Sequence, residues 1–195
     1  MEYRIYLVCV LLCAARSIHT SATCSDANEI RLANYTESYY GYIQLRHNCA
    51  WGYIHGPSFS QELANIACRQ LGFTKILRFD THAVYLDQRL LLHGFQCPKN
   101  ATNLLKCPYS STGKITSTFL VARAECEVDC GEPLVGVKSN VSWSNTTLGS
   151  TATYTCLPNT MHLSGNATLS CNGSGLWEGG EYACGDLQCS VRKNI

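Results

Sequence analysis

The sequence predicts two disulfide-rich extracellular modules: an α+β module with one helix, followed by a small all-β module. Three observations support this fold class: 13 cysteines among 195 residues, an apolar leader, and a change in composition at residues 127–129. Cysteines at this density indicate disulfides in an oxidising compartment, and small domains often need such crosslinks because their cores are small. We therefore expect two units that each depend on disulfides.

The leader, residues 1–22, is typical of a secretory signal peptide. A basic residue precedes an apolar run from Ile5 to Ala15, and small residues allow cleavage after Ser17 or Ala22. A bilayer-spanning helix needs about 20 apolar residues, so this run is too short to serve as one. We expect a secreted, extracellular chain with no membrane insertion.

The mature chain keeps an odd number of cysteines. Cys9 and Cys13 leave with the leader, so eleven of the 13 remain. These are Cys24, Cys49, Cys68, Cys97, Cys107, Cys126, Cys130, Cys156, Cys171, Cys184 and Cys189. An odd number leaves at least one without an intrachain partner. Six N-x-S/T sequons also indicate the secretory route, and we expect N-glycosylation at Asn34, Asn100, Asn140, Asn145, Asn166 and Asn172.

The charge of the chain is nearly balanced, with 15 Lys and Arg against 14 Asp and Glu. No run of like charge favours nucleic acid as a partner. Four histidines lack the short spacing of metal ligands, so we expect no metal at His47, His55, His82 or His93. No local signature positions a Ser-His-Asp triad, so the sequence predicts no catalytic residues and no enzyme.

The segment before residue 127 mixes strand and helix patterns. Residues 42–47 alternate apolar and polar side chains, which predicts a strand with one buried face. A helix follows, because Ser58 and Gln61 have capping-box spacing and Gly72 is placed to end it. Its apolar face is predicted to hold Leu63, Ile66, Ala67 and Leu71. Short strands are predicted at 83–86, 90–95 and 119–126.

The segment from Cys130 to Cys184 shows no helical periodicity. Runs at 151–156 and 167–171 are separated by turn-forming residues, which predicts a small all-β module. A module of roughly 55 residues cannot bury a large core. Its four cysteines are expected to form two disulfides, and spacing alone leaves three pairings open.

The first segment carries a recognisable motif set. The start IRL at 30–32, the pair Trp51-Gly52 and the pentapeptide CRQLG at 68–72 follow at fixed spacing. On these residues, 30–126 resembles a scavenger receptor cysteine-rich (SRCR) domain. The resemblance implies small curved sheets with one helix, an extracellular protein or glycan ligand, and the disulfides Cys68–Cys126 and Cys97–Cys107.

The second segment carries its own marks: CGEP at 130–133, Gly149 leading to Tyr154, and Trp177 shortly before the last cysteine. On these residues, 130–184 is similar to a complement control protein module, also called a sushi domain. This resemblance implies the disulfides Cys130–Cys171 and Cys156–Cys184.

His55 stands shortly after Trp51, where the SRCR family has a cysteine. Counting back from Cys126 places the partner position at Thr116, so both ends of that family bridge are missing. The family's acidic calcium ligands are missing too, because their positions hold Gly56, Pro57, Ser60 and Leu120. The resemblance therefore implies a lost calcium site and no cofactor.

Two cysteine questions remain. We expect Cys24 and Cys49 to bond to each other, in partial replacement of the missing bridge. Cys189 is predicted to be unpaired within the chain, and residues 185–195 to be the start of a truncated further module or a short tail. A longer protein is the favoured interpretation of Cys189, followed by a disulfide to a partner chain and then a free thiol.

Two surface groups have both a functional and a plain structural interpretation. The tyrosines of YTESYYGY, Tyr35, Tyr39, Tyr40 and Tyr42, form either a contact surface or strand packing. Six basic residues form either a face for polyanions or an ordinary solvated surface, which we favour: Arg69, Lys75, Arg78, Arg89, Lys99 and Lys106.

The function predicted from sequence is that of a secreted, non-enzymatic recognition or adhesion protein in innate defence or cell adhesion. One alternative is the N-terminal, non-catalytic part of a larger mosaic receptor or protease. Another is a matrix or aggregation component that is disulfide-linked through Cys189.

Overall fold

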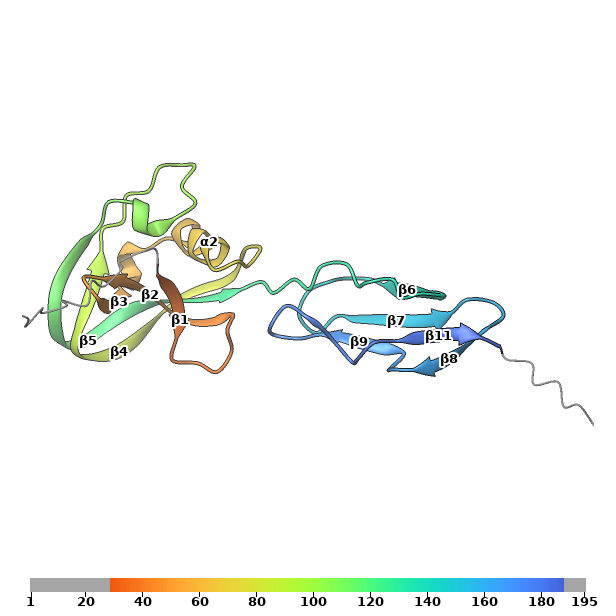
Figure 1. The fold of residues 1–195 in the computed structure, drawn as a ribbon. Helices are drawn as coiled ribbons and strands as arrows, with labels where there is room; N and C mark the ends of the chain where they lie inside the picture. The colour runs from red at the N-terminus through yellow and green to blue at the C-terminus, as the bar shows by residue number, and fades with distance from the viewer. Residues whose placement is uncertain (1–28, 188–195) are drawn as a thin grey trace, which may run out of the picture.

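A computed structural model describes residues 29–187 as two units that follow one another along the chain (Figure 1). The predicted signal peptide, Cys24 and Cys189 lie outside these residues. Within them, no helix is both long and apolar enough to cross a bilayer. Each unit has two disulfides between described cysteines, which coincide with the pairs that the two resemblances imply: Cys68–Cys126, Cys97–Cys107, Cys130–Cys171 and Cys156–Cys184.

The first unit is built on a curved five-stranded sheet that closes on itself. Its strands are β1 (Ile30–Ala33), β2 (Tyr40–His47), β3 (Ala50–Ile54), β4 (Ile76–His93) and β5 (Ser110–Cys126). They are ordered β1-β2-β3-β4-β5, and β2 also pairs with β5, so the last four strands form a ring. The β3–β4 pairing is parallel, whereas the pairings of β2 and of β5 are antiparallel.

β4 and β5 form a long antiparallel ribbon that bends around one end of the unit (Figure 1). The separate strands predicted at 83–86 and 90–95 are parts of β4, which ends at His93, two residues before the second predicted strand does. The β4–β5 register shifts between Leu86 and Arg89, where Gln88 has a φ of 51°. Such a bulge bends a strand without ending it, which explains why the sequence pattern is broken while the strand continues.

The α-helix α2 (Gln61–Gln70) has Ser60 as its N-cap, and the Ser60 side chain accepts a hydrogen bond from a backbone amide of the first turn. The predicted capping box of Ser58 and Gln61 is therefore wrong. Ser58 belongs to the preceding 3-10 helix η1 (Gly56–Ser58), which uses Pro57 to set its first turn. Gly72 has a φ of 93°, a left-handed conformation that ends the helix as predicted.

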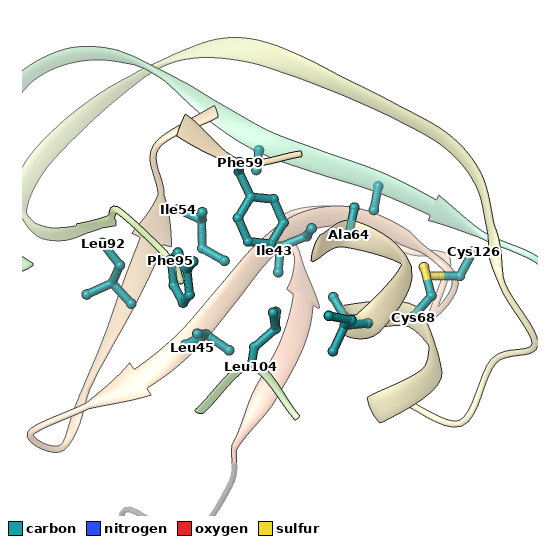
Figure 2. Close-up of a cluster of buried hydrophobic side chains, with 14 residues drawn as sticks. Ile43, Leu45, Ile54, Phe59, Ala64, Cys68, Leu92, Phe95, Leu104 and Cys126 are labelled. Carbon is teal, nitrogen blue, oxygen red and sulfur yellow. A yellow bond between two sulfur atoms is a disulfide. The ribbon is translucent and has the colours of Figure 1, made fainter. Parts of the chain in front are cut away.

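The apolar face of α2 packs on the sheet and forms the core of the first unit (Figure 2). Ile66 and Ala67 are buried and Leu63 is half-buried, as the sequence predicts, whereas Leu71 is the C-cap. The other members include Ile43, Leu45, Ile54, Phe59, Ala64, Leu92, Phe95 and Leu104. The disulfide from Cys68 to Cys126 joins the helix to β5 beside this core (Figure 2). A short 3-10 helix, η2 (Leu104–Lys106), lies within the loop that Cys97–Cys107 closes.

The second unit is all-β within the described residues. Four strands pair in the order β10-β9-β7-β6: β6 (Ser139–Trp143), β7 (Thr151–Cys156), β9 (Thr168–Cys171) and β10 (Trp177–Glu178). Two more, β8 (Thr160–Ser164) and β11 (Ala183–Asp186), pair with each other. The buried cluster is small, consisting of Ala152, Tyr154 and Leu169, so the two disulfides supply much of the crosslinking.

Candidate recognition surface

A cluster of aromatic and charged side chains lies on the first unit, where β2, β3, β4 and β5 meet. We call it the tyrosine–arginine cluster; its members are Tyr35, Tyr40, Tyr42, Tyr53, Asp80, His82 and Arg123. Strand register assembles it, because Arg123 of β5 is paired with Tyr42 of β2 on one side and with Asp80 of β4 on the other. Side chains of paired residues lie on the same face of a sheet.

Arg123 is the centre of this cluster. Its guanidinium donates two hydrogen bonds to the Asp80 carboxylate, from Nε to Oδ1 at 2.8 Å and from Nη2 to Oδ2 at 2.7 Å. Nη1 donates to the Tyr35 hydroxyl at 2.9 Å, and the guanidinium carbon lies 5.4 Å from the centre of the Tyr40 ring. The hydrogen bonds from Arg123 lower the pKa of Asp80, and the same pairing raises the pKa of Arg123. Both oxygens of the Asp80 carboxylate are thus occupied by hydrogen bonds from Arg123.

The tyrosine rings pack around Tyr42. The centroid of the Tyr35 ring lies 4.4 Å from that of Tyr40 and 5.6 Å from that of Tyr42. Tyr53 and His82 each have their ring centroids 6.0 Å from Tyr42. Burial, together with a hydrogen bond to Tyr35, raises the pKa of Tyr42 to about 12, whereas the hydrogen bond from Arg123 lowers the pKa of Tyr35.

The cluster has a buried base and an exposed face. Tyr42 and Tyr53 are buried, whereas Tyr35 is 39% exposed and His82 is also exposed. Asn34, a predicted glycan site, has its Nδ2 3.1 Å from the hydroxyl of Tyr53, which accepts its hydrogen bond. A glycan on Asn34 would therefore border the cluster.

The sequence located only part of this surface. Tyr35, Tyr40 and Tyr42 are together, but Tyr39 packs on the second unit, where a Cβ added to Gly173 would lie 3.0 Å from Cε1 of Tyr39. Tyr39 lies in the turn that precedes β2, so the strand register that groups Tyr40 with Tyr42 does not place it. Tyr53, Asp80, His82 and Arg123 were missed, since their only shared feature is strand register, which no local motif records.

His55 lies beside Val121 of β5 and not beside Thr116. His55 forms an isolated antiparallel bridge with Val121, and its amide donates to the carbonyl of Leu92 at 2.8 Å. Thr116 lies earlier on β5, where it accepts hydrogen bonds from Gln88. The two positions that the resemblance assigns to the missing family disulfide, His55 and Thr116, are therefore not opposite each other in the sheet.

The positions of the family's calcium ligands hold no carboxylate. Gly56 is buried against Thr81 and Val121, and an added Cβ would overlap the Thr81 methyl group. Pro57 and Ser60 are exposed, and Leu120 is exposed on β5. In residues 29–187, no group of three or more His, Cys, Asp or Glu is arranged to hold a metal. The loss of the calcium site stays a prediction.

The four histidines are separated. His47 Nδ1 lies 3.0 Å from the Tyr109 hydroxyl, and His55 Nδ1 lies 3.1 Å from Ser58 Oγ. His82 belongs to the tyrosine–arginine cluster, and His93 is paired with Ser110 at the end of the β4–β5 ladder. They occupy four different surroundings.

The six basic residues are also dispersed. Lys75 forms a salt bridge with Glu127 at 3.1 Å and Arg78 forms one with Glu125 at 2.5 Å. The others lie on α2, on β4 and in the Cys97–Cys107 loop: Arg69, Arg89, Lys99 and Lys106. Acidic neighbours thus neutralise part of the set.

The other residues predicted from the sequence are cysteines and sequon asparagines. Cys49 is disulfide-bonded, and its predicted partner Cys24 lies outside the described residues, as does Cys189. Five sequon asparagines are exposed, namely Asn34, Asn100, Asn140, Asn145 and Asn166. Asn172 is half-buried, and its Oδ1 accepts hydrogen bonds from the amides of Ser174 and Leu176. Occupancy of these sites by glycans stays a prediction.

Comparisons with known proteins agree with the geometry of the first unit. A family model described as "Scavenger receptor cysteine-rich domain" matches residues 33–131. The chain is also similar to "Lysyl oxidase homolog 2A" of Danio rerio, with 32% identity over 88 residues. That alignment covers 44% of this chain and only 12% of the relative.

Proposed function

Because the chain belongs to the scavenger receptor cysteine-rich family, we propose that it is an extracellular, non-enzymatic recognition or adhesion protein. It binds a protein or glycan ligand, in innate defence or cell adhesion, without calcium or another cofactor. Residues 130–184 act beside the first unit as a sushi module. Export by the predicted leader, with N-linked glycans, is part of the same proposal.

The exposed face of the tyrosine–arginine cluster carries this proposal. Tyr35 and His82 present aromatic surface to solvent while Arg123 is held in place by two hydrogen bonds to Asp80. Tyrosine and arginine are favoured at protein interfaces, because a rigid ring or guanidinium loses little conformational freedom on binding. The positive charge is balanced by Asp80, so the surface suits a neutral partner or a glycan better than a polyanion.

Two features of the second unit support the sushi assignment. Its disulfides pair Cys130 with Cys171 and Cys156 with Cys184, the pattern that the resemblance implies. Trp177, the strongest motif residue, donates from Nε1 to the carbonyl of Gly131 at 3.0 Å. This hydrogen bond joins β10 to the segment that begins the second unit at Cys130 and Gly131.

A larger mosaic protein is the second candidate. The similarity to lysyl oxidase homolog 2A spans about one eighth of that protein, as expected if an SRCR unit is shared among longer chains. Transcript sequence beyond residue 195 that encodes a membrane span or a protease domain would favour it. A third candidate, covalent assembly through Cys189, predicts multimers on non-reducing electrophoresis, and a purely monomeric band would count against it.

The test uses the full secreted chain on a glycan array and on a panel of extracellular-matrix proteins. We expect binding that persists in EDTA and falls with Tyr35→Ala. Tyr85→Ala is the matched control, because Tyr85 is 66% exposed on β4 outside the cluster. Strict dependence on calcium, or equal effects of the two substitutions, would contradict the proposal.

A further inference from the structure

The second unit carries an apolar groove with a volume of about 720 Å³. Four of its lining side chains are strongly exposed: Leu134 (87%), Val135 (68%), Val137 (81%) and Leu176 (63%). The rings of Tyr154 and Trp177 also line it. Exposed apolar side chains gathered in this way mark interaction sites on soluble proteins, and the volume is that of an ordinary ligand site.

The wall of this groove is held in place by hydrogen bonds from its aromatic residues. The Tyr154 hydroxyl donates to the carbonyl of Leu134 at 2.7 Å. Trp177 Nε1 donates to the carbonyl of Gly131, and Cys130 at the base of the same segment is bonded to Cys171. Both polar groups of the rings are therefore satisfied by the wall. Tyr154 is buried and supports the groove from below, whereas the half-buried Trp177 keeps apolar ring surface open to a partner.

Among residues 29–187, the charged side chains that line the groove are acidic. They are Glu132 and Glu181, and no Lys, Arg or His of these residues lines it. Neither carboxylate takes part in a salt bridge within residues 29–187. An unpaired carboxylate beside apolar surface favours a partner that brings a cation with its apolar side chain.

The predicted glycan sites of the second unit lie outside the lining of this groove. Four of the predicted glycan sites lie in the second unit, and none of the four lines the groove: Asn140, Asn145, Asn166 and Asn172. Asn172 is the nearest of the four in contact terms, since its Oδ1 accepts a hydrogen bond from the amide of the lining residue Leu176.

We propose that this groove docks a protein segment in which an apolar side chain is flanked by Lys or Arg. The inference rests on the proposed function, because it names the chemistry of a partner for an extracellular recognition protein. The apolar side chain inserts beside Val135 and Trp177, and the cation lies against Glu132 or Glu181. An anionic bilayer also attracts apolar surface, but the two carboxylates repel it.

The test titrates the full chain with three matched hexapeptides, GKLLKG, GELLEG and GKSSKG, each blocked at both ends. Binding is followed through the NMR signal of the Trp177 indole N–H, assigned by Trp177→Phe. We expect a saturable shift with GKLLKG that neither other peptide reproduces. Absence of a shift with GKLLKG, or an equal shift with all three peptides, would overturn the proposal.

Charge reversal separates this site from the rest of the surface. The double variant Glu132→Lys with Glu181→Lys should weaken GKLLKG binding by about tenfold and gain binding of GELLEG. Glu178→Lys is the matched control, because Glu178 is exposed in the same unit and does not line the groove. An equal loss in the control, or tighter binding of the chain to phosphatidylserine vesicles than to GKLLKG, would contradict docking of a basic apolar segment.

Failure of this inference is distinguishable from failure of the proposed function. If binding on the array depends on Tyr35 but GKLLKG causes no shift of the Trp177 signal, recognition through the first unit stands and only the groove proposal fails. If GKLLKG binds while the array shows no ligand, the groove stands and the tyrosine–arginine cluster loses its proposed role.

Discussion

Replacing Asp80 with Asn tests how firmly the tyrosine–arginine cluster is organised. Asp80 accepts two hydrogen bonds from Arg123, whose side chain is only 17% exposed. Asparagine has the same shape, but its amide NH₂ faces an Arg123 donor, so one hydrogen bond and the negative charge are lost. Hydrogen bonds to charged groups contribute about 1.5–3 kcal/mol, whereas exposed ion pairs contribute about 0–1 kcal/mol. Because Asp80 is 39% exposed, we expect unfolding free energy to fall by about 1–2 kcal/mol at pH 7.

The pH dependence of this effect follows from the direction of the pKa shift. The hydrogen bonds from Arg123 lower the pKa of Asp80 in the folded state. A lowered carboxyl pKa stabilises the folded state above the unfolded pKa, and this contribution is lost as the pH falls through the folded pKa. The difference between wild type and Asp80→Asn should therefore shrink below about pH 4.

Urea unfolding followed by intrinsic fluorescence, at neutral and acidic pH, measures both quantities. Asp87→Asn is the matched control, since Asp87 is exposed on β4 and forms no salt bridge within the described residues. We expect that control to change the unfolding free energy by less than about 0.5 kcal/mol. Equal stability of the two variants, or a loss in Asp80→Asn that is unchanged at low pH, would show that Asp80 does not stabilise the fold through Arg123.

Three further predictions concern the scaffold of the first unit. Replacing Cys68 and Cys126 together by Ala opens a loop with a sequence separation of 58, and should lower the unfolding free energy by about 4 kcal/mol. Thermal unfolding of the purified variant measures this, and a loss below about 1 kcal/mol would contradict the loop-entropy estimate. Ser60→Ala removes the N-cap of α2 and should cost about 1 kcal/mol in urea unfolding, whereas Ser60→Asp should retain most of that stability. Gly56→Ala should cost about 1–3 kcal/mol because the new Cβ meets the Thr81 methyl, and Thr81→Ser should restore part of it. If Thr81→Ser restores nothing in a urea double-mutant cycle, the crowding at Gly56 has another cause.

Local sequence features predicted much of the first unit. The apolar positions of α2 are readable because helix periodicity is a short-range signal, and Gly72 ends the helix because its left-handed backbone suits glycine. The sequence offers two serines, Ser58 and Ser60, as the N-cap of α2, and the prediction chose the wrong one. Ser58 is excluded because it belongs to the 3-10 helix at Gly56–Ser58, which is not evident from the sequence. The strand pattern was interrupted by the bulge near Gln88, which bends β4 without ending it.

The sequence alone therefore predicted four features: the high cysteine content, the motif spacing of an SRCR domain, the helix at Gln61–Gln70 and the change in composition near residue 127. Each of these depends on residues close together in the chain. The surface that carries the proposed function depends on contacts between distant segments, since Arg123 meets Tyr35, Tyr42 and Asp80 only through the register of three strands. Register also places Val121, and not Thr116, opposite His55. Side-chain position in a sheet alternates with every residue, so a single shift reverses which groups meet, and only the folded sheet decides it.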